Sequence, residues 1–496
     1  MPLRPWLAAS PILLVLVLMA GFGRSAALSG AAGLALAAGL AFGPFALDRA
    51  TGVGIFASFL GVALEGLFLA ATVVAIVWPA LALHRWQEET GALERVRAAL
   101  GVLTTDPAAR TLLVGWFFAL FVEGAAGFGT PVALAAPLLA GFGLAPARAV
   151  AVALIGHAVG VSFGAVGTPV LAQAELVSVA ERALAGPTAL IHGLLGPGLA
   201  IAAVARAGAM RQAPGRALAL ALLAAVLFLS PSVLIAHAIG PELPTLLGAL
   251  AGGAGFVLLL ARFRPPSFAG LRLGSALAPY LVLIGLVLVT RLAAPVRVLA
   301  EAPVLGWQLW GRFGGSVRPL FHPGTLLAAA FLLGGIWRGA RLPVLLRTLG
   351  RTGLGLGRVA VGLVAMLTLS RLMLHAGMIA ALAEAATRGI GPLYPAVAPA
   401  VGALGAFVTG SATASNILFS ALQEATAEGL GLPPVLLLAA QGVGAAVGNI
   451  VCPHNIVAGA ATVGIAGAEG AILRATLLPC LLYLAAAGAL VWSFAP

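Results

Sequence analysis

Long apolar stretches separated by short polar loops run along the whole chain. About 20 consecutive apolar residues are enough for a helix to span a bilayer. The pattern therefore predicts an all-α polytopic membrane protein with about 12–14 transmembrane segments, forming a single domain over residues 1–496. The uninterrupted stretches are 7–22, 26–47, 55–83, 149–163, 189–205, 217–239, 243–260, 276–290, 325–336, 359–373, 435–447 and 471–492.

Two further apolar stretches, 112–142 and 397–421, are interrupted in their middle by small and polar residues. The first interruption reads EGAAGFGTPV (123–132) and the second reads FVTGSATASN (407–416). Non-helical backbone is tolerated inside a membrane only where protein buries it or where it lines a cavity. Each stretch is therefore predicted to form a broken helix or a re-entrant hairpin.

Each interruption is followed by another, FGAVGTPV in the first case and VGNIVCPHN in the second. Gly129 and Gly167 are 38 residues apart, and so are Gly410 and Gly448. The equal spacing predicts two repeats, and paired interruptions of this kind point to the binding site of a transporter. The predicted repeat cores are about 109–186 and about 392–470.

Polar side chains concentrate in these interruptions, which hold the only three asparagines of the chain. Such side chains can cap helix ends or bridge helices, and a half-helix N-terminus can also offer free N–H groups to an anion. We therefore predict that the interruptions bind an anionic substrate. The candidate substrate-binding residues are Gly127, Gly129, Thr130, His157, Thr168, Gly410, Ser411, Thr413, Ser415, Asn416 and Asn449.

Glu123 follows the apolar run LLVGWFFALFV, where a carboxylate usually faces protein or water rather than lipid. It is predicted either to carry a proton or to accept backbone N–H groups at the hairpin tip. His157, in ALIGHAVGV, is either a second proton-coupling residue or an interhelical hydrogen-bond partner. Arg371, Glu65 and His454 also lie in apolar surroundings, and each is left open as a substrate contact.

Only 8% of the residues are charged, against roughly 25% in soluble domains, so lipid must be the main solvent. The formal charge of +12 comes from a chain with no lysine, whose 27 basic residues are all arginines. They gather in short loops, which follows the positive-inside rule and does not indicate nucleic-acid binding. Three loops are predicted to face the cytoplasm: Arg206, Arg211 and Arg216; Arg262, Arg264 and Arg272; and Arg338, Arg341, Arg347, Arg351 and Arg358.

The chain carries no Walker A, HExxH or GxSxG motif, and its two cysteines form no CxxC pair. We therefore expect no cofactor or metal site, and transport driven by an ion or substrate gradient. Residues 1–23 could be a signal peptide, but we interpret them as a first transmembrane helix because another apolar segment follows at once.

EGAAGFGTPV and GAFVTGSATASNILFSALQ (405–423) resemble the bacterial L-lactate permease family, which also carries glycolate. The similarity continues through FGAVGTPV, GPELP and LLAAQGVGAAVGNIVCPHNIV, in the same order and over most of the chain. The resemblance implies an elevator-like fold with two inverted repeats. It also implies proton-coupled symport of L-lactate, glycolate or a similar 2-hydroxymonocarboxylate across the bacterial plasma membrane. Because the chain has no lysine and arginine does not deprotonate, Glu123 is predicted to carry the proton, with His157 as the reserve. A homodimer is left open.

Three positions depart from the family pattern. The second hairpin of the family commonly reads GSDTSSN, and this chain has Ala412 in place of the aspartate. His157 is often asparagine in relatives, and Asn449 is often lysine. An ion-coupled carrier of another small organic anion is therefore an alternative. A passive channel and an intramembrane lipid-modifying enzyme are further alternatives, although the two aspartates, Asp48 and Asp106, lie in loops without matching catalytic partners.

Overall fold

The computed structural model describes residues 3–22, 24–47, 52–92, 94–95, 99–100, 103–127, 129–177, 179–262, 273–465 and 468–495. Asp48, Arg264 and Arg272 lie outside the described residues. Within them, nine helices are long and apolar enough to cross a membrane, or up to eleven if each of two bent pairs is one span. Four further apolar helices have 10–17 residues, and the higher predicted number of segments came from counting stretches of this length.

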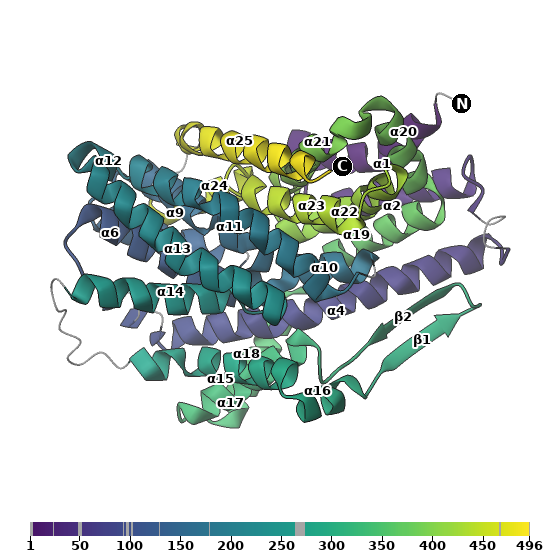
Figure 1. Ribbon diagram of the computed structural model, residues 1–496. Helices are drawn as coiled ribbons and strands as arrows, with labels where there is room; N and C mark the ends of the chain where they lie inside the picture. The colour runs from purple at the N-terminus through teal and green to yellow at the C-terminus, as the bar shows by residue number, and fades with distance from the viewer. Residues whose placement is uncertain are drawn as a thin grey trace.

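Two parts of the chain have the same order of elements: a hairpin, a broken helix and a long helix (Figure 1). The first unit contains α6 (Pro107–Leu112), the π-helix η2 (Leu113–Phe118), α7 (Ala119–Ala125), α8 (Thr130–Gly141), α9 (Pro146–His157), the 3-10 helix η3 (Ala158–Phe163), α10 (Gly164–Val177) and α11 (Glu181–Arg206). The second unit contains α21 (Tyr394–Thr409), α22 (Ala412–Gly429), α23 (Pro434–Gly448), α24 (Pro453–Thr462) and α25 (Glu469–Ser493).

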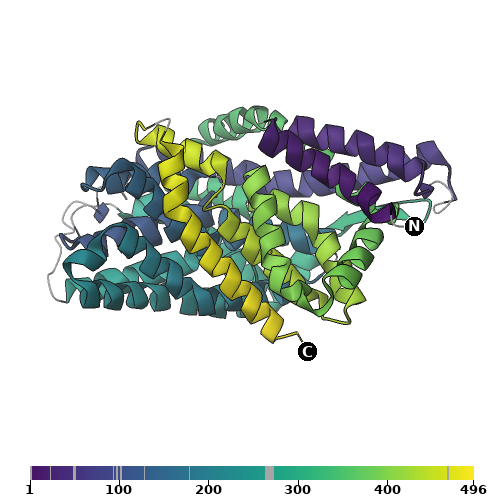
Figure 2. The ribbon, with the colours of Figure 1, turned by 90° about the horizontal axis from the view of Figure 1, so that it is seen from above.

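The two units pack on each other reciprocally. Helix α8 of the first unit corresponds to α22 of the second, and α10 corresponds to α24. Helix α8 contacts α24, and α22 contacts α10. In the same way α9 contacts α25, and α23 contacts α11. Such exchanged contacts are expected when two similar units are related by an approximate two-fold axis. From above, α25, the last helix of the second unit, runs diagonally across the molecule (yellow in Figure 2). The core bounds, the inverted orientation and an elevator-like movement of the repeats stay predictions.

The remaining helices surround these units. Proline in the first turn opens many helices of the chain, including α8, α9, α13, α14, α23 and α24, where the missing N–H costs nothing. The surrounding helices are α1 (Arg4–Leu16), η1 (Val17–Gly21), α2 (Ala26–Phe42), α4 (Ile55–Glu89), α12 (Ala209–Gln212), α13 (Pro214–Ala238), α14 (Pro244–Ala261), α15 (Leu273–Leu292), α16 (Ala294–Glu301), α17 (Pro323–Trp337), α18 (Leu342–Gly355), α19 (Gly357–His375), α20 (Met378–Gly389) and η4 (Gly391–Leu393).

A β-hairpin departs from the predicted all-α fold. Strands β1 (Leu305–Leu309) and β2 (Phe313–Val317) pair antiparallel within the stretch LGWQLWGRFGGSV. Phe313 is buried against Gly61 of α4, where an added Cβ would lie 2.3 Å from the ring. The tight turn is made by Trp310 and Gly311, both with positive φ. Apolar side chains on one strand face therefore hold the hairpin against α4.

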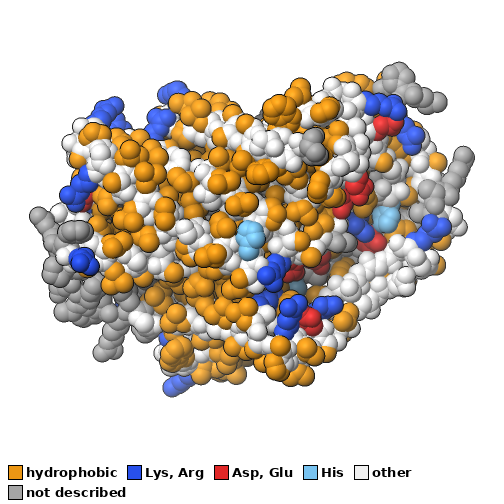
Figure 3. Space-filling view, in the orientation of Figure 1, with side chains coloured by type: hydrophobic (Ala, Val, Ile, Leu, Met, Phe, Trp, Pro, Cys, Tyr) orange, Lys and Arg blue, Asp and Glu red, His pale blue; other side chains and the backbone are white. Residues whose placement is uncertain are grey.

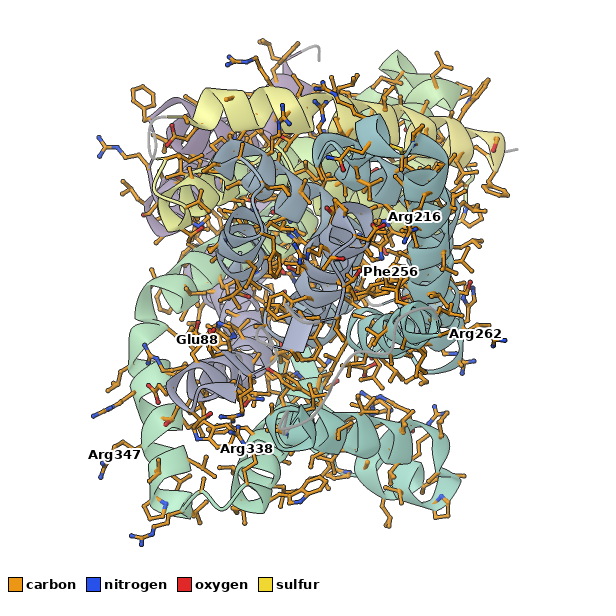
Figure 4. The ribbon with its side chains drawn as sticks, turned by 90° about the vertical axis from the view of Figure 1, so that its left-hand side faces the viewer. Glu88, Arg216, Phe256, Arg262, Arg338 and Arg347 are labelled. Atoms are coloured by element: carbon orange, nitrogen blue, oxygen red, sulfur yellow. The ribbon has the colours of Figure 1, made fainter. Side chains whose placement is uncertain are left out.

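The outer surface fits a lipid environment. Hydrophobic side chains cover most of the face in Figure 3, and charged side chains gather toward its margins and in one group below the centre. The turn at α12 and the C-terminal end of α14 lie at the left-hand end of Figure 1. Figure 4 views that end and shows Arg216 and Arg262 there, together with Arg338 and Arg347 of the third loop. That this end is cytoplasmic stays a prediction.

Candidate functional site

A cavity of about 960 Å³ lies where the interruptions of both units meet α2, α4 and α19. One wall comes from the two units and combines small, polar and apolar residues. We call the other the framework wall, and define it as Met19, Arg24, Ser25, Ala27, Val73, Val77, Val359, Gly362, Leu363 and Met366. The two hairpin tips therefore face one common cavity, lined by Gly127 and Gly129 from the first and by Gly410, Ser411 and Thr413 from the second.

The tip of the first hairpin depends on two glycines. Gly127 has φ +60° and Gly129 has φ +80°, in the left-handed region that favours glycine. Between α7 and α8, the Thr130 hydroxyl donates to the Gly127 carbonyl at 2.7 Å and closes the turn. The chain can thus reverse inside the membrane while the small residues leave the backbone open to the cavity.

The second interruption of the first unit is more strained. Ala165, Val166 and Gly167 follow one another with φ of 43°, 56° and 81°. A left-handed conformation costs about 1–2 kcal/mol per residue that carries a Cβ. The Thr168 hydroxyl donates to the Ala165 carbonyl at 2.6 Å, and Gly167 lies against Pro241, where an added Cβ would meet the carbonyl oxygen at 2.4 Å. The GPELP segment (240–244) thus braces this strained turn.

Glu123 and His157 form a buried pair beside these turns. The carboxylate Oε2 lies 3.9 Å from His157 Nε2, and both residues are less than 5% exposed. His157 Nδ1 lies 2.7 Å from the Ala153 carbonyl, which can only accept, so Nδ1 carries a proton. In neutral His157, Nε2 then presents its lone pair to Glu123. Gly164 makes room for the carboxylate, because an added Cβ would lie 2.0 Å from Oε1.

The second unit presents hydroxyl and amide groups in place of this pair. Gly410 has φ +77°, and Ser411 caps α22 by accepting the Ala414 N–H at 3.3 Å. Thr413 lines the cavity, and its hydroxyl has no hydrogen-bond partner among the described residues. The hydroxyl is therefore free to contact a substrate.

The broken helix of the second unit completes this wall. Asn455 donates from Nδ2 to Asn449 Oδ1 at 2.9 Å. Asn455 Oδ1 also lies close to Gly129, at 3.4 Å from an added Cβ, so this break reaches the first hairpin. The Nδ2 group of Asn449 has no hydrogen-bond partner in the described part of the chain and is available as a donor.

The cavity contains most of the predicted site residues. Three lie elsewhere: Thr130 closes its own turn, Ser415 donates to the Gly402 carbonyl at 2.7 Å, and Asn416 donates to the Pro169 carbonyl at 3.1 Å. Ser415, two residues after Thr413, lies on the far side of α22. Asn416, three residues after Thr413, lies at the edge of the same side and is held toward α10 by its hydrogen bond to Pro169. The predicted residues that line the cavity are Glu123, Gly127, Gly129, His157, Thr168, Gly410, Ser411, Thr413 and Asn449.

The cavity also has lining residues outside the predicted set. His454, which the sequence left open, lines the cavity, whereas Arg371 and Glu65 are not among its lining residues. Arg371 Nε donates to Glu65 Oε2 at 2.9 Å, and His375 Nε2 lies 2.8 Å from the same oxygen. These groups tie α19 to α4 in place of binding a ligand. The whole framework wall was missed, because its residues come from uninterrupted apolar helices and one short loop.

A second cavity of about 710 Å³ is lined in part by α4 and α10, which also line the first cavity. The first cavity contains Val77 of α4 and Thr168 of α10, and the second contains Ile76 and Glu175 of these helices. The Thr72 hydroxyl donates to Glu175 Oε2 at 2.9 Å and joins α4 to α10. Contact between α4 and α10 therefore separates the two cavities in this conformation.

Comparison with known proteins agrees with this architecture. The family model described as L-lactate permease matches residues 6–299 and 315–495. A relative from Haemophilus influenzae, whose name refers to L-lactate permease, is 30% identical over 84% of this chain and 86% of its own. The glycolate permease GlcA of Escherichia coli is 29% identical, over 83% of this chain and 82% of its own.

The solved YdaH transporter of Alcanivorax borkumensis shares 16% identity over 89% of this chain and 88% of its own, with a TM-score of 0.48. The family assignment depends on the sequence match, which covers nearly the whole chain. The chain therefore belongs to the L-lactate permease family, and it is a multi-pass transporter of the bacterial plasma membrane.

Proposed function

We propose that the protein is a secondary active symporter that moves L-lactate, glycolate or a similar 2-hydroxymonocarboxylate together with protons. The buried pair of Glu123 and His157 at the wall of the shared cavity carries this proposal. A buried carboxylate and imidazole can hold and release a proton without exposing an unpaired charge to lipid. The names of the two relatives support lactate and glycolate as substrates.

The opposite unit supplies the contacts for the substrate itself. A 2-hydroxymonocarboxylate needs donors for its carboxylate and a partner for its hydroxyl group. The free hydroxyl of Thr413 and the Nδ2 group of Asn449 can contact the 2-hydroxyl group from α22 and the end of α23. Backbone at Gly127 and Gly410 leaves space for a small ligand between the tips.

Coupling follows from the position of the proton site beside the substrate site. An anion that moves inward against a negative-inside potential needs a compensating cation. Arginine does not deprotonate in proteins, and the chain has no lysine, so a carboxylate or histidine must carry the proton. Glu123 is the one acid among the described residues that line the cavity.

A carrier of another small organic anion is the second candidate, favoured by the surroundings of Ala412. In place of the family's aspartate, Ala412 packs in a small buried cluster with Val161, Ala406 and Ala445. This part of the wall is apolar in the present chain, which suits a substrate with an additional methyl or methylene group.

Uptake into proteoliposomes tests both candidates. We expect labelled L-lactate to accumulate when an inward proton gradient is imposed, and an uncoupler to abolish the accumulation. Competition by a panel of carboxylates that differ in the 2-hydroxyl group and in chain length would rank substrates. Uptake that needs no proton gradient and follows a sodium gradient would reject proton symport. Failure of lactate and glycolate to compete, while another carboxylate does, would favour the second candidate.

A further inference from the structure

Arg24 is the feature of the cavity that the proton and substrate sites leave unexplained. It belongs to the framework wall, in the loop between η1 and α2. Among the described lining residues the groups that can carry charge are Arg24, Glu123, His157 and His454, apart from the thiol of Cys452. Only the guanidinium keeps its positive charge at every pH at which the protein is folded.

The backbone of Arg24 is fixed on both sides. Its N–H donates to the Leu18 carbonyl at 2.9 Å. The next residue, Ser25, caps α2 by accepting the Leu28 N–H at 3.3 Å. α2 in turn packs along α19, which contributes Val359 and Met366 to the same wall. The position of Arg24 is thus set by the framework rather than by a flexible loop.

The guanidinium of Arg24 has no counter-ion in the described part of the chain. Two other arginines in apolar surroundings are held by carboxylates, Arg371 by Glu65 and Arg291 by Glu242. Arg24 is exposed, and it makes no such pair with any described residue. An arginine fork without a partner, facing a cavity that should hold a carboxylate, matches the bidentate geometry that guanidinium groups form with carboxylates.

A fixed positive charge in the cavity would couple protonation of Glu123 to binding of the anion. With Glu123 protonated and both histidines neutral, Arg24 leaves the described lining with a net charge of +1, which one monocarboxylate neutralises. After Glu123 loses its proton, Arg24 already balances that carboxylate, and a bound anion would leave the cavity negative. Loading of the proton and binding of the anion would then favour each other through charge alone.

We propose that Arg24 binds the carboxylate of the substrate from the framework wall, while the 2-hydroxyl group faces Thr413 and Asn449 on the opposite wall. The proposal depends on the proposed function, since it assumes a 2-hydroxymonocarboxylate as substrate. It adds a specificity residue that lies outside both units. Because the framework and the units carry opposite ends of the ligand, binding would bridge the two parts of the molecule.

The test compares Arg24→Gln, Arg24→Lys and the parent in proteoliposomes, with Arg211→Gln as the matched control. Arg211 is likewise exposed, in the short helix α12, and does not line the cavity. We expect Arg24→Gln to raise KM for L-lactate about tenfold or more, as loss of a charged hydrogen bond implies. Arg24→Lys should be intermediate, because an ammonium keeps the charge but not the fork.

A second readout separates charge recognition from a structural role. Lactamide has the shape of lactate without its charge, so its inhibition constant should change less than twofold in Arg24→Gln. Lactate KM within twofold of the parent in Arg24→Gln would overturn the proposal, and so would equal losses of lactate and lactamide affinity. If the parent itself transports no 2-hydroxymonocarboxylate, the proposed function fails instead. If Arg24→Gln does not fold, Arg24→Lys is compared with the parent. A lactate KM and a lactamide inhibition constant that are both the same as in the parent would reject bidentate binding of the carboxylate by Arg24.

Discussion

The two units share an order of elements but bring different chemistry to the cavity. The first unit contributes the buried titratable pair of Glu123 and His157. The second contributes neutral groups, chiefly Thr413, Asn449 and Asn455, and its histidine at the cavity, His454, is exposed. A helix broken at glycine therefore places a titratable pair at the cavity in one unit and neutral hydrogen-bonding groups in the other. The proposed function assigns the proton to the first unit and the substrate to the second.

The largest effect should come from removing the titratable group of the first unit. Glu123→Gln should lose accumulation of substrate in response to a pH gradient, because the amide mimics the protonated form and cannot cycle. Exchange of internal for external substrate should persist, since it needs no net proton movement. Both activities can be measured in one reconstituted preparation. Normal gradient-driven accumulation would show that Glu123 is structural, and His157 or a sodium ion would then be tested.

The next largest effect should come from Gly164, which makes room for Glu123. In Gly164→Ala the new Cβ would lie 2.0 Å from Glu123 Oε1, so the carboxylate must move from His157. Overpacking of this kind costs about 1–3 kcal/mol, and we expect proton-driven uptake to fall at least tenfold. Gly141→Ala is the control, because nothing lies within 4 Å of its added Cβ. Equal uptake by the two variants would show that transport does not depend on the position of the Glu123 carboxylate beside His157.

Thr413→Val tests the second unit. Loss of a hydroxyl that bonds the substrate should raise KM by about tenfold, within the range of about 1–3 kcal/mol for a buried group left unpaired. The dependence of uptake on pH should stay as in the parent, because no titratable group is changed. Thr476→Val is the control, since its hydroxyl bonds only to carbonyls of its own helix. A shifted pH profile in Thr413→Val would contradict the proposal that the first unit holds the proton and the second unit contacts the substrate.

The smallest effect should come from the contact that joins the two units. Ser162 of the first unit donates to the Gly442 carbonyl at 3.1 Å, so it accepts from His192 Nε2 at 2.9 Å. His192 Nδ1 must then accept from the Tyr483 hydroxyl of the second unit, at 2.7 Å. All of these groups are buried.

Tyr483→Phe should therefore lower the free energy of unfolding by about 1 kcal/mol, as expected for one lost hydrogen bond. Lactate KM should not change, because none of these groups lines the cavity. Thermal unfolding in detergent and uptake kinetics measure the two quantities separately. A changed KM with unaltered stability would indicate that the junction between the units controls transport and does not only support the fold.

The sequence by itself determined the membrane environment and the position of the interruptions. Charge is too rare for a water-facing surface, and glycine with small polar residues breaks the apolar runs where the hairpins turn. Left-handed backbone at Gly127, Gly129 and Gly410 explains why these residue types stand there. The β-hairpin was not predicted, because its strands are short and depend on packing against α4.

Only the tertiary structure decided which side chains face the cavity. Thr413 and Asn416 belong to one interruption and are neighbours on the same side of α22. Thr413 lines the cavity, whereas Asn416 lies against α10 and donates to the Pro169 carbonyl. Val73 and Val77 look in sequence like residues that face lipid, because lipid and an apolar cavity wall select the same side chains. Arg24 likewise reads as a loop arginine until α2 is placed along α19. Each of these assignments depends on neighbours far away in the chain, and local sequence carries no record of them.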